Sequence, residues 1–468
     1  MLRGAGVLLH ITSLPGGCFV GDLGPEAYKF ADSLAYAEQT YWQTLPINHT
    51  VPEYENSPYS AVSSYAGDPV LISLELMKRD GLIDSVPQCP PAERADYIKA
   101  WEVKRKALEK ALKRAGRLSD YRHFKDVTPW LDDYAYYMAM RERFGPWPVW
   151  PKEEPPPASL ELYKFAQFVF WTQWERFKEY VNSLGIFLIG DLPFYPSLDS
   201  VDVWRNKKYF KVGEDGRPLY VAGVPPDYFS ATGQLWGNPV YNWEALERDG
   251  FKWWVNRLKH AVTVFDYVRL DHFRGYVAYW EVPGGETTAV RGRWAPSPGR
   301  RLFEAAAAAV DLGRLIAEDL GYITPEVEAL REELGLPGMR VLQFAWDGNP
   351  ANPHKPHNHV KNAVVYTGTH DNNTAVGWYK EEATARARRE FKKYSNCAGE
   401  VHWCFIKLAH MSVANVAIVP VQDLLGLGSE ARMNRPGTVG GNWKWRLGAQ
   451  PEPRVWKRLR DVTRTYGR

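Results

Sequence analysis

Four acidic residues stand at the ends of short apolar runs in this chain. They are Asp191 in IGDLPFY, Asp271 in VRLDHFRG, Glu318 in IAEDLG and Asp371 in YTGTHDNN. A single Asp after a strand is ordinarily a turn or cap residue. Four acidic side chains at one edge of a fold need another explanation. Like charges close together raise one another's pKa and destabilise the protein, so such a cluster is retained where a reaction needs it. Their repeated placement therefore indicates a catalytic site.

Cleavage of a glycosidic bond is a reaction that needs such a set of carboxyl groups. One carboxylic acid protonates the leaving oxygen, and a second carboxylate meets the positive charge that grows at the anomeric carbon. Asp271 and Glu318 end successive runs, so we expect them to be neighbours, with Asp271 as the nucleophile and Glu318 as the acid. Carboxyl groups about 5 to 5.5 Å apart would retain the configuration of the sugar through a covalent intermediate.

Arg269 lies two residues before Asp271, so both side chains point to the same face of a strand. Its fixed positive charge would keep Asp271 ionised. Glu318 would then ionise less readily than Asp271 and keep its proton as the acid. An interior salt bridge with no part in catalysis is the alternative interpretation of Arg269.

Eight runs of β-branched or apolar residues, most of them followed by a helical pattern, indicate a parallel α/β sheet. They lie at residues 7–11, 41–45, 186–190, 267–270, 315–317, 339–344, 363–366 and 416–419. Eight such units predict a (β/α)8 TIM barrel, in which the acids at the strand ends meet at one mouth. We expect a single catalytic barrel over residues 1–468.

Two long insertions interrupt this pattern. Residues 70–165 contain polar helical stretches and a proline-rich segment, which predicts an inserted, mainly helical subdomain whose basic residues 104–114 face the solvent. Residues 192–242 are rich in Pro, Gly and aromatic residues and are expected to fold as loops over the barrel mouth. Within them, residues 223–238 would form a lid over the active site.

Charge and composition exclude several classes of function. The 58 basic and 55 acidic residues are spread along the chain and give a net charge of +3, which argues against a nucleic-acid partner. No run approaches 18 apolar residues, and no leader of the secretory type begins the chain, so we expect a soluble, cytoplasmic protein without membrane contact. His354, His357 and His359 have no carboxylate or cysteine beside them, so a solvated loop is favoured over a metal site.

The four cysteines, Cys18, Cys89, Cys397 and Cys404, show no Cys-x-x-Cys spacing and are too few for a disulfide scaffold. We expect buried thiols. A bridge between Cys397 and Cys404 stays open as the alternative in a thermophile.

A series of longer motifs runs nearly from end to end of the chain: VLLHITSLPG, SPYSAVSSYAGDPVLI, IGDLPFY, GVPPDYFSATGQLWGNPVY, VRLDHFRG, IAEDLG, GTHDNNT and VQDLLGLGSEARMNRPGTVGGNWKWR. In these motifs and in their order, the chain resembles the amylomaltase, or 4-α-glucanotransferase, family. This is glycoside hydrolase family 77, a relative of the α-amylase superfamily. The resemblance implies a barrel that needs neither a cofactor nor a metal.

The resemblance also implies roles for individual residues. Asp271 would be the nucleophile, Glu318 the general acid and base, and Asp371 the third acid, which distorts the sugar and stabilises the transition state. Asn373 stands where members of the family usually carry Asp. Contacts to the substrate are implied for Ser57, Tyr59, Asp191, Tyr228, Phe229, Gln234, Trp236, Arg269, His272, His370 and Asn442, with Tyr228 and Phe229 at the tip of the lid.

The activity implied by the resemblance is transfer between glucans. The enzyme would cut an α-1,4 bond in a donor, hold the glycosyl group on Asp271 and pass it to an acceptor, with maltooligosaccharides, amylose or glycogen as substrates. Long chains would also close into cyclic glucans, and Tyr54 would belong to a second, remote glucan site. A hydrolase of the α-amylase type is one alternative, and a glucan-binding barrel without activity is another.

Overall fold

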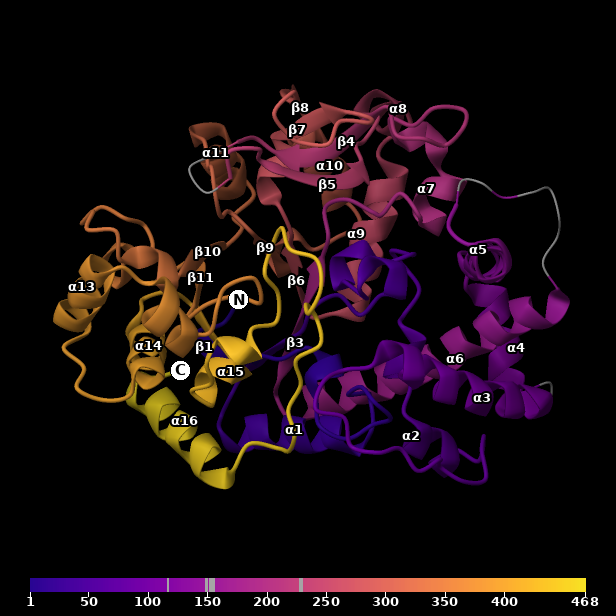
Figure 1. Ribbon diagram of the computed structural model, residues 1–468, viewed down its shortest axis with the longest axis horizontal. Helices are drawn as coiled ribbons and strands as arrows, with labels where there is room; N and C mark the ends of the chain where they lie inside the picture. Colours follow the sequence, from indigo (N-terminus) through magenta and orange to yellow (C-terminus); the bar gives the residue numbers. More distant parts are fainter. Residues whose placement is uncertain (116–117, 148–149, 151–155, 227–229) are drawn as a thin grey trace.

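Eight short strands lie side by side in one parallel sheet in the order β10-β11-β12-β1-β2-β3-β6-β9. The computed structural model describes residues 1–115, 118–147, 150, 156–226 and 230–468. The two outer strands approach each other, because the Ala317 amide in β9 donates to the Pro337 carbonyl, one residue before β10, at 2.9 Å. The sheet is thus nearly closed into the expected (β/α)8 barrel (Figure 1).

The strands are β1 (Gly4–Leu8), β2 (Tyr41–Gln43), β3 (Phe187–Leu192), β6 (Tyr267–Leu270), β9 (Leu315–Ala317), β10 (Gly338–Val341), β11 (Ala363–Tyr366) and β12 (Val416–Pro420). Nearly every position in them is buried, as in parallel sheets that are covered on both faces. The eight expected runs correspond to these eight strands. The first begins at Gly4, earlier than expected, because the strand pattern at its start is hidden by small residues. Gly6 must be small, since a Cβ there would lie 2.4 Å from the Tyr41 carbonyl oxygen.

Helices follow the strands and cover the outside of the barrel (Figure 1). A proline at the first position begins several of them, where its missing N–H costs nothing; α11, for example, begins at Pro325 after Thr324. The described α-helices that do not lie wholly within the two insertions are α1 (Pro25–Tyr36), α6 (Pro157–Ser183), α8 (Trp243–Arg248), α9 (Lys252–Val264), α10 (Gly299–Ala307), α11 (Pro325–Glu333), α12 (Ala375–Gly377), α13 (Ala385–Ser395), α14 (Val401–Met411), α15 (Val421–Leu424) and α16 (Pro453–Thr465).

The described residues of the first insertion contain four complete α-helices, which lie with α6 on one side of the molecule in Figure 1. They are α2 (Leu74–Arg79), α3 (Tyr97–Ala115), α4 (Ser119–Val127) and α5 (Leu131–Phe144). The expectation of a solvated basic face on α3 is wrong for Lys104, whose side chain is fully buried. Its Nζ donates to Asp22 Oδ2 at 2.9 Å and to the Val70 carbonyl at 2.5 Å. An unpaired charge would be costly in this buried position. The contacts of the Lys104 ammonium with Asp22 and Val70 therefore hold α3 against the barrel.

The second insertion contains more regular structure than the loops expected from its composition. It begins with the short helix α7 (Val201–Arg205). Two strands follow, β4 (Tyr220–Val224) and β5 (Gln234–Pro239), and they belong to an antiparallel sheet of order β5-β4-β7-β8. The partner strands β7 (Ala278–Pro283) and β8 (Arg293–Pro296) lie outside the insertion. The pairing was therefore invisible in the segment alone. We retain the division into one barrel with insertions at 70–165 and 192–242 as a proposal.

Both pairs of cysteines form disulfides, Cys18 with Cys89 and Cys397 with Cys404. The expectation of buried thiols is wrong. For Cys397 and Cys404, the structure has the disulfide that was the alternative. Cys18 and Cys89 are 71 residues apart in the sequence. Only the folded chain brings them together, so the spacing of the cysteines in the sequence did not predict this disulfide. Among the described residues, no helix is both long and apolar enough to cross a membrane.

The two disulfides predict unequal losses of stability when they are removed. A bridge stabilises chiefly by limiting the unfolded chain, and more so for a longer loop. We expect the Cys18→Ser/Cys89→Ser variant to lose about 4 kcal/mol of unfolding free energy, and Cys397→Ser/Cys404→Ser about 2 kcal/mol. Urea denaturation under non-reducing conditions measures both. Equal losses, or free thiols titrated in the native wild-type protein, would contradict this account.

Candidate active site

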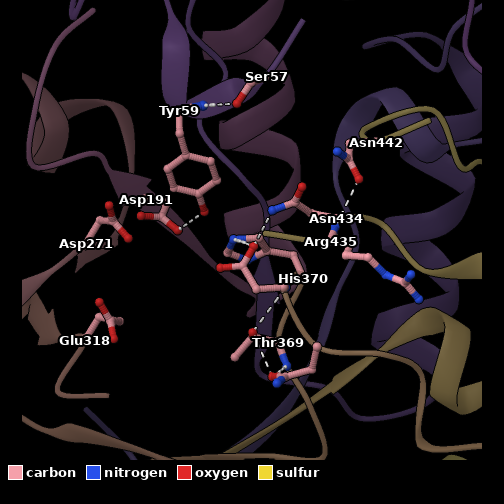
Figure 2. Close-up of polar contacts among 12 residues, drawn as sticks. Ser57, Tyr59, Asp191, Asp271, Glu318, Thr369, His370, Asn434, Arg435 and Asn442 are labelled. Atoms are coloured by element: carbon pink, nitrogen blue, oxygen red, sulfur yellow. Dashed lines mark hydrogen bonds and ion pairs between the residues drawn. The ribbon is translucent and has the colours of Figure 1, made fainter. Parts of the chain in front are cut away.

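The acidic residues singled out in the sequence lie at the carboxyl ends of the barrel strands. Asp191 is the penultimate residue of β3, while Asp271 and Glu318 directly follow β6 and β9. Asp371 comes five residues after the end of β11. Figure 2 shows Asp191, Asp271 and Glu318 on one side of the site, with the loop of His370 across from them and Tyr59 alongside. The barrel mouth thus brings the predicted acids together, as strand ends do in this fold.

The guanidinium of Arg269 joins three of these carboxylates. Its Nη1 donates to both Asp191 oxygens, at 2.8 and 2.9 Å, and to Asp271 Oδ1 at 2.9 Å. Its Nη2 lies 3.8 Å from Glu318 Oε2. The Arg269 side chain is 5% exposed and that of Asp191 is fully buried. The salt bridge proposed as the alternative interpretation is therefore present, but it also reaches Asp271 and Glu318.

Glu318 is held by two backbone amides. His272 N donates to its Oε2 at 2.8 Å, and Leu320 N donates to its Oε1 at 3.0 Å. The pKa of Glu318 is raised to about 8, chiefly by burial and also by the negative charge of Asp271, while Arg269 and the two backbone amides oppose the shift. Burial is thus the main reason why Glu318 keeps its proton, a cause that we did not assign from the sequence. Glu318 is a carboxylic acid near neutral pH, in the state that a general acid requires.

His272 follows Asp271 in a left-handed backbone conformation, with φ of 49°. This conformation is rare for a residue with a side chain and costs free energy. Burial lowers the pKa of His272 to about 4, so the ring is neutral. Its Nε2 has no hydrogen-bond partner among the described residues, and the edge of Trp236 packs on it with ring centroids 5.0 Å apart. The nitrogen is therefore a buried hydrogen-bonding atom next to Asp271.

Tyr59 connects the two sides of the site. Its hydroxyl donates to Asp191 Oδ2 at 2.8 Å, and its ring stacks on that of His370 with centroids 5.1 Å apart. The neighbouring Ser57 caps the short 3-10 turn Pro58–Ser60, which contains Tyr59, because Ser57 Oγ accepts from the Tyr59 amide at 3.3 Å. The aromatic ring therefore forms a fixed wall, a surface suited to stacking against a sugar.

Asp371 is the most open of the acids, with 41% of its side chain exposed. Asn434 Nδ2 donates to its Oδ1 at 2.6 Å, and Arg432 Nη2 donates to its backbone carbonyl at 2.7 Å. Sequence reasoning missed Asn434 and Arg432. Their place in the motif ARMNRPG, shortly before the expected site residue Asn442, was the signal that could have pointed to them.

Asn373 lies behind Asp371 and is buried. Its amide nitrogen donates to Glu382 Oε1 and to Ser429 Oγ, both at 2.9 Å. An ionised Asp in this place would lack the donor and would face Glu382 with a like charge. The Asn therefore suits its partner Glu382, and it links the Asp371 loop to the segment around Ser429.

The other expected contact residues line the approach to the acids or lie elsewhere. Trp236 Nε1 donates to Gln234 Oε1 at 3.2 Å on β5, and Trp236 is 39% exposed. Asn442 Oδ1 accepts from the Arg435 amide at 3.0 Å, so it shapes the loop that also carries Asn434. Figure 2 shows Asn442 on the far side from Asp271 and Glu318. Tyr228 and Phe229 fall outside the described residues.

Of the three histidines at 354–359, His357 is exposed as expected for a solvated loop, whereas His354 and His359 are not. His354 Nδ1 accepts from the Val341 amide at 3.0 Å, and buried His359 pairs with Ser412 Oγ at 2.7 Å. They hold a loop against β10 and the turn after α14. Within the described ranges, no cluster of three or more His, Cys, Asp or Glu residues is arranged to hold a metal ion.

Comparisons with known proteins agree with one another. A family model described as 4-alpha-glucanotransferase matches residues 9–450. The 4-alpha-glucanotransferase of Aquifex aeolicus is 46% identical over 95% of this chain and 96% of the relative. The chloroplastic/amyloplastic 4-alpha-glucanotransferase of Solanum tuberosum is 43% identical over 100% of this chain and 86% of the relative. Amylomaltase from Streptococcus agalactiae, solved in complex with acarbose, superposes with a TM-score of 0.93 at 36% identity, covering 100% of this chain and 99% of that one.

The ion pair between Asp191 and Arg269 predicts a large stability effect. Removing one partner of a buried pair costs about 3–5 kcal/mol, and here it would leave Arg269 with Asp271, whose side chain is 28% exposed, as its hydrogen-bonded partner. We expect Asp191→Asn to lose that much unfolding free energy in urea denaturation. Asp371→Asn is the matched control; it removes an acid of the same site whose side chain is 41% exposed, and we expect a loss below about 1 kcal/mol. Similar losses in the two variants would count against a structural role of the Arg269 cluster.

Proposed function

The chain belongs to the 4-alpha-glucanotransferase family, and from this premise we propose how its own carboxylates carry out the transfer of α-1,4-glucan segments. The observation that carries the proposal is the placement of Arg269 between two unlike carboxyl groups. It donates to Asp271 at 2.9 Å and lies 3.8 Å from Glu318, whose pKa burial raises to about 8. The hydrogen bond from Arg269 orients Asp271 for attack, while burial holds Glu318 in its acid form.

Asp271 is the proposed nucleophile. It directly follows β6, is 28% exposed toward the cleft, and keeps Oδ2 out of the contact with Arg269, which engages Oδ1. An oxygen of Asp271 attacks the anomeric carbon, and the bond from that carbon to the leaving oxygen breaks. The donor glycosyl group is then joined to Asp271 as an ester, with its configuration inverted once.

Glu318 is the proposed acid and base. In the first step its proton passes to the leaving oxygen, which departs as the 4-hydroxyl of the released glucan. In the second step the Glu318 carboxylate takes the proton of an incoming 4-hydroxyl, whose oxygen displaces Asp271. The second inversion restores the α configuration, so the number of α-1,4 bonds is unchanged.

Asp371, His370 and Tyr59 are proposed to hold the sugar across from the nucleophile. The Asp371 carboxylate is oriented by Asn434 at 2.6 Å and leaves its second oxygen for sugar hydroxyls. The stacked rings of Tyr59 and His370 limit where a pyranose fits. Interactions of this kind accelerate the reaction only when they are stronger in the transition state, where the sugar ring is flattened and positively charged.

Transfer in place of hydrolysis requires an acceptor sugar to reach the intermediate before water does. Ser57, Gln234, Trp236 and Asn442 are the proposed contacts beyond the scissile sugar, and Tyr228 and Phe229 the proposed lid. Trp236 supports this assignment, since it is 39% exposed and packs on His272 beside the nucleophile. The family supports transfer over the alternatives of an α-amylase-type hydrolase and an inactive glucan-binding barrel.

The family acts on α-1,4-glucans, and we propose maltooligosaccharides, amylose and glycogen as donors and acceptors, with cyclic glucans as products of long chains. Tyr54 remains proposed for a remote glucan site. We also propose a cytoplasmic location, although the potato relative is named chloroplastic/amyloplastic. The two disulfides are compatible with this location in a hyperthermophilic organism, because intracellular proteins of such organisms often contain disulfides.

The nucleophile is tested by Asp271→Asn with maltotriose as the only substrate. The wild-type protein is expected to give glucose and a ladder of longer oligomers, whereas hydrolysis would give glucose and maltose alone. The variant, which lacks the attacking oxyanion, should lose at least about a thousandfold in kcat while its circular dichroism is unchanged. Appreciable turnover by the variant would show that another residue is the nucleophile.

The acid is tested by the pH dependence of kcat/KM. Since burial raises the pKa of Glu318 to about 8, the group is protonated below pH 8 and loses its proton above it. We expect kcat/KM for maltotriose to fall on the alkaline side near that value. A maltosyl fluoride donor needs no proton for its leaving group, so its kcat/KM should lack this decline. The same alkaline decline with both donors would contradict the role of Glu318.

A further inference from the structure

A buried arginine whose nearest acidic neighbour, Glu326, lies beyond salt-bridge distance is found three residues after Asp271. Arg274, in the 3-10 turn Phe273–Tyr276, is 9% exposed and forms no ion pair within the described part of the chain. Its Nη1 donates to the Tyr322 carbonyl at 3.0 Å, and its Nε has no partner among the described residues. No described residue accepts a hydrogen bond from Nη2. Burial lowers the pKa of Arg274, and the charge of Glu326 opposes that shift only in part, so a guanidinium with unused donors gains from a polar ligand.

Two exposed aromatic rings flank this guanidinium. Its central carbon lies 3.9 Å from the ring centroid of Trp294 and 5.1 Å from that of Tyr322. Trp294, on β8, is 37% exposed, and Tyr322 is 71% exposed. The ring of Trp280 meets Trp294 edge to face, with centroids 5.4 Å apart. The contacts with Arg274 and Trp280 hold Trp294 in place on the surface, and the attraction of the cation to the ring faces offsets part of the desolvation cost.

The three side chains together match the chemistry of a sugar. An aromatic ring offers an apolar face against which the C–H face of a pyranose packs, and a guanidinium nitrogen offers a donor to its hydroxyl oxygens. Exposed aromatic area held rigidly on the surface commonly marks a binding site. A neutral polyhydroxyl chain satisfies the spare donor of Arg274 and covers both rings at once.

The position of these residues ties them to the catalytic cleft. Arg274 follows Asp271 by three residues, so their Cα atoms are at most about 11 Å apart. Tyr322 follows Glu318 by four residues, in the loop between β9 and α11. Trp294 is on β8, and Figure 1 shows the sheet that contains β8 beyond the ends of β6 and β9. The platform therefore adjoins the same mouth as the acids.

We propose that Trp294, Arg274 and Tyr322 form a platform that binds the distant part of an α-1,4-glucan while the reacting bond of the same chain occupies the cleft. The platform rests on the proposed function for its ligand. A long glucan then gains affinity that a short one does not, because only a chain of several units spans both places. The platform would thus favour long substrates without taking part in the chemistry at Asp271.

The test compares short and long substrates in Trp294→Ala and Tyr322→Ala. We expect each variant to raise the KM for amylose about five- to tenfold, the loss of one stacking contact. The kcat with amylose, and both constants with maltotriose, should stay within about twofold of the wild type. Trp294→Phe, which keeps a ring, should restore most of the amylose KM. Tyr322→Ala removes a largely exposed side chain, so it leaves the fold intact even if Trp294→Ala does not.

The matched control is Tyr36→Ala. Tyr36 is 47% exposed and has Arg460 over its ring at 4.4 Å, but it ends α1, five residues before β2 begins, at the opposite end of the barrel. Its removal should leave the KM for amylose unchanged. An unchanged amylose KM in the platform variants, or an equal rise with maltotriose, would overturn the platform. Absence of transfer by the wild-type protein would instead overturn the proposed function.

The chemical class of the ligand is tested by calorimetry in the Asp271→Asn background. Maltoheptaose should bind, and its affinity should fall about five- to tenfold when Tyr322→Ala is added. Inorganic phosphate is the second probe, because an unpaired guanidinium also suits an anion. Saturable phosphate binding that displaces maltoheptaose from the Tyr322-dependent site would show an anion site and overturn the assignment to a glucan.

Discussion

The buried guanidinium of Arg269 is the interaction on which the active site depends. It reaches carboxylates on three neighbouring strands, Asp191 on β3, Asp271 after β6 and Glu318 after β9. A cation buried to this degree is stable only while those partners stay in place, so the register of β3, β6 and β9 and the charge state of the site are set together. A slip of one residue in any of these strands would turn an acid to the other face of the barrel wall.

The same cluster separates the roles of two carboxyl groups that lie close together. Asp271 shares Arg269 with a fully buried neighbour yet remains partly open to the cleft. Glu318 is farther from the guanidinium, receives two backbone amides, and is held mainly in its acid form by burial. Asp371 is fixed from the opposite wall by Asn434. The barrel thus brings together three carboxyl groups in different surroundings: one partly open beside Arg269, one held as an acid by burial, and one exposed across from them.

Sequence patterns located the strands and the acids well, because both signals are local. A strand shows itself in a short apolar run, and Asp271 and Glu318 stand directly after such runs. What the sequence could not reveal depends on contacts between distant segments. The hydrogen bond from Asn434 to Asp371 joins residues 63 apart in the sequence, and the disulfide between Cys18 and Cys89 joins residues 71 apart. Strand β4 pairs with β7 although the barrel strand β6 lies between them in the sequence. The main cause of the raised pKa of Glu318, its burial, likewise exists only in the folded chain.

The most direct test of the division of roles between Asp271 and Glu318 is to trap the covalent intermediate and locate it by mass spectrometry. Glu318→Gln incubated with maltosyl fluoride can form the ester without an acid, but it lacks the base that would speed its breakdown. The account predicts a protein heavier by one maltosyl group, with the added mass on the peptide that contains Asp271. A stable adduct on any other residue, or rapid turnover of the fluoride without an adduct, would contradict it.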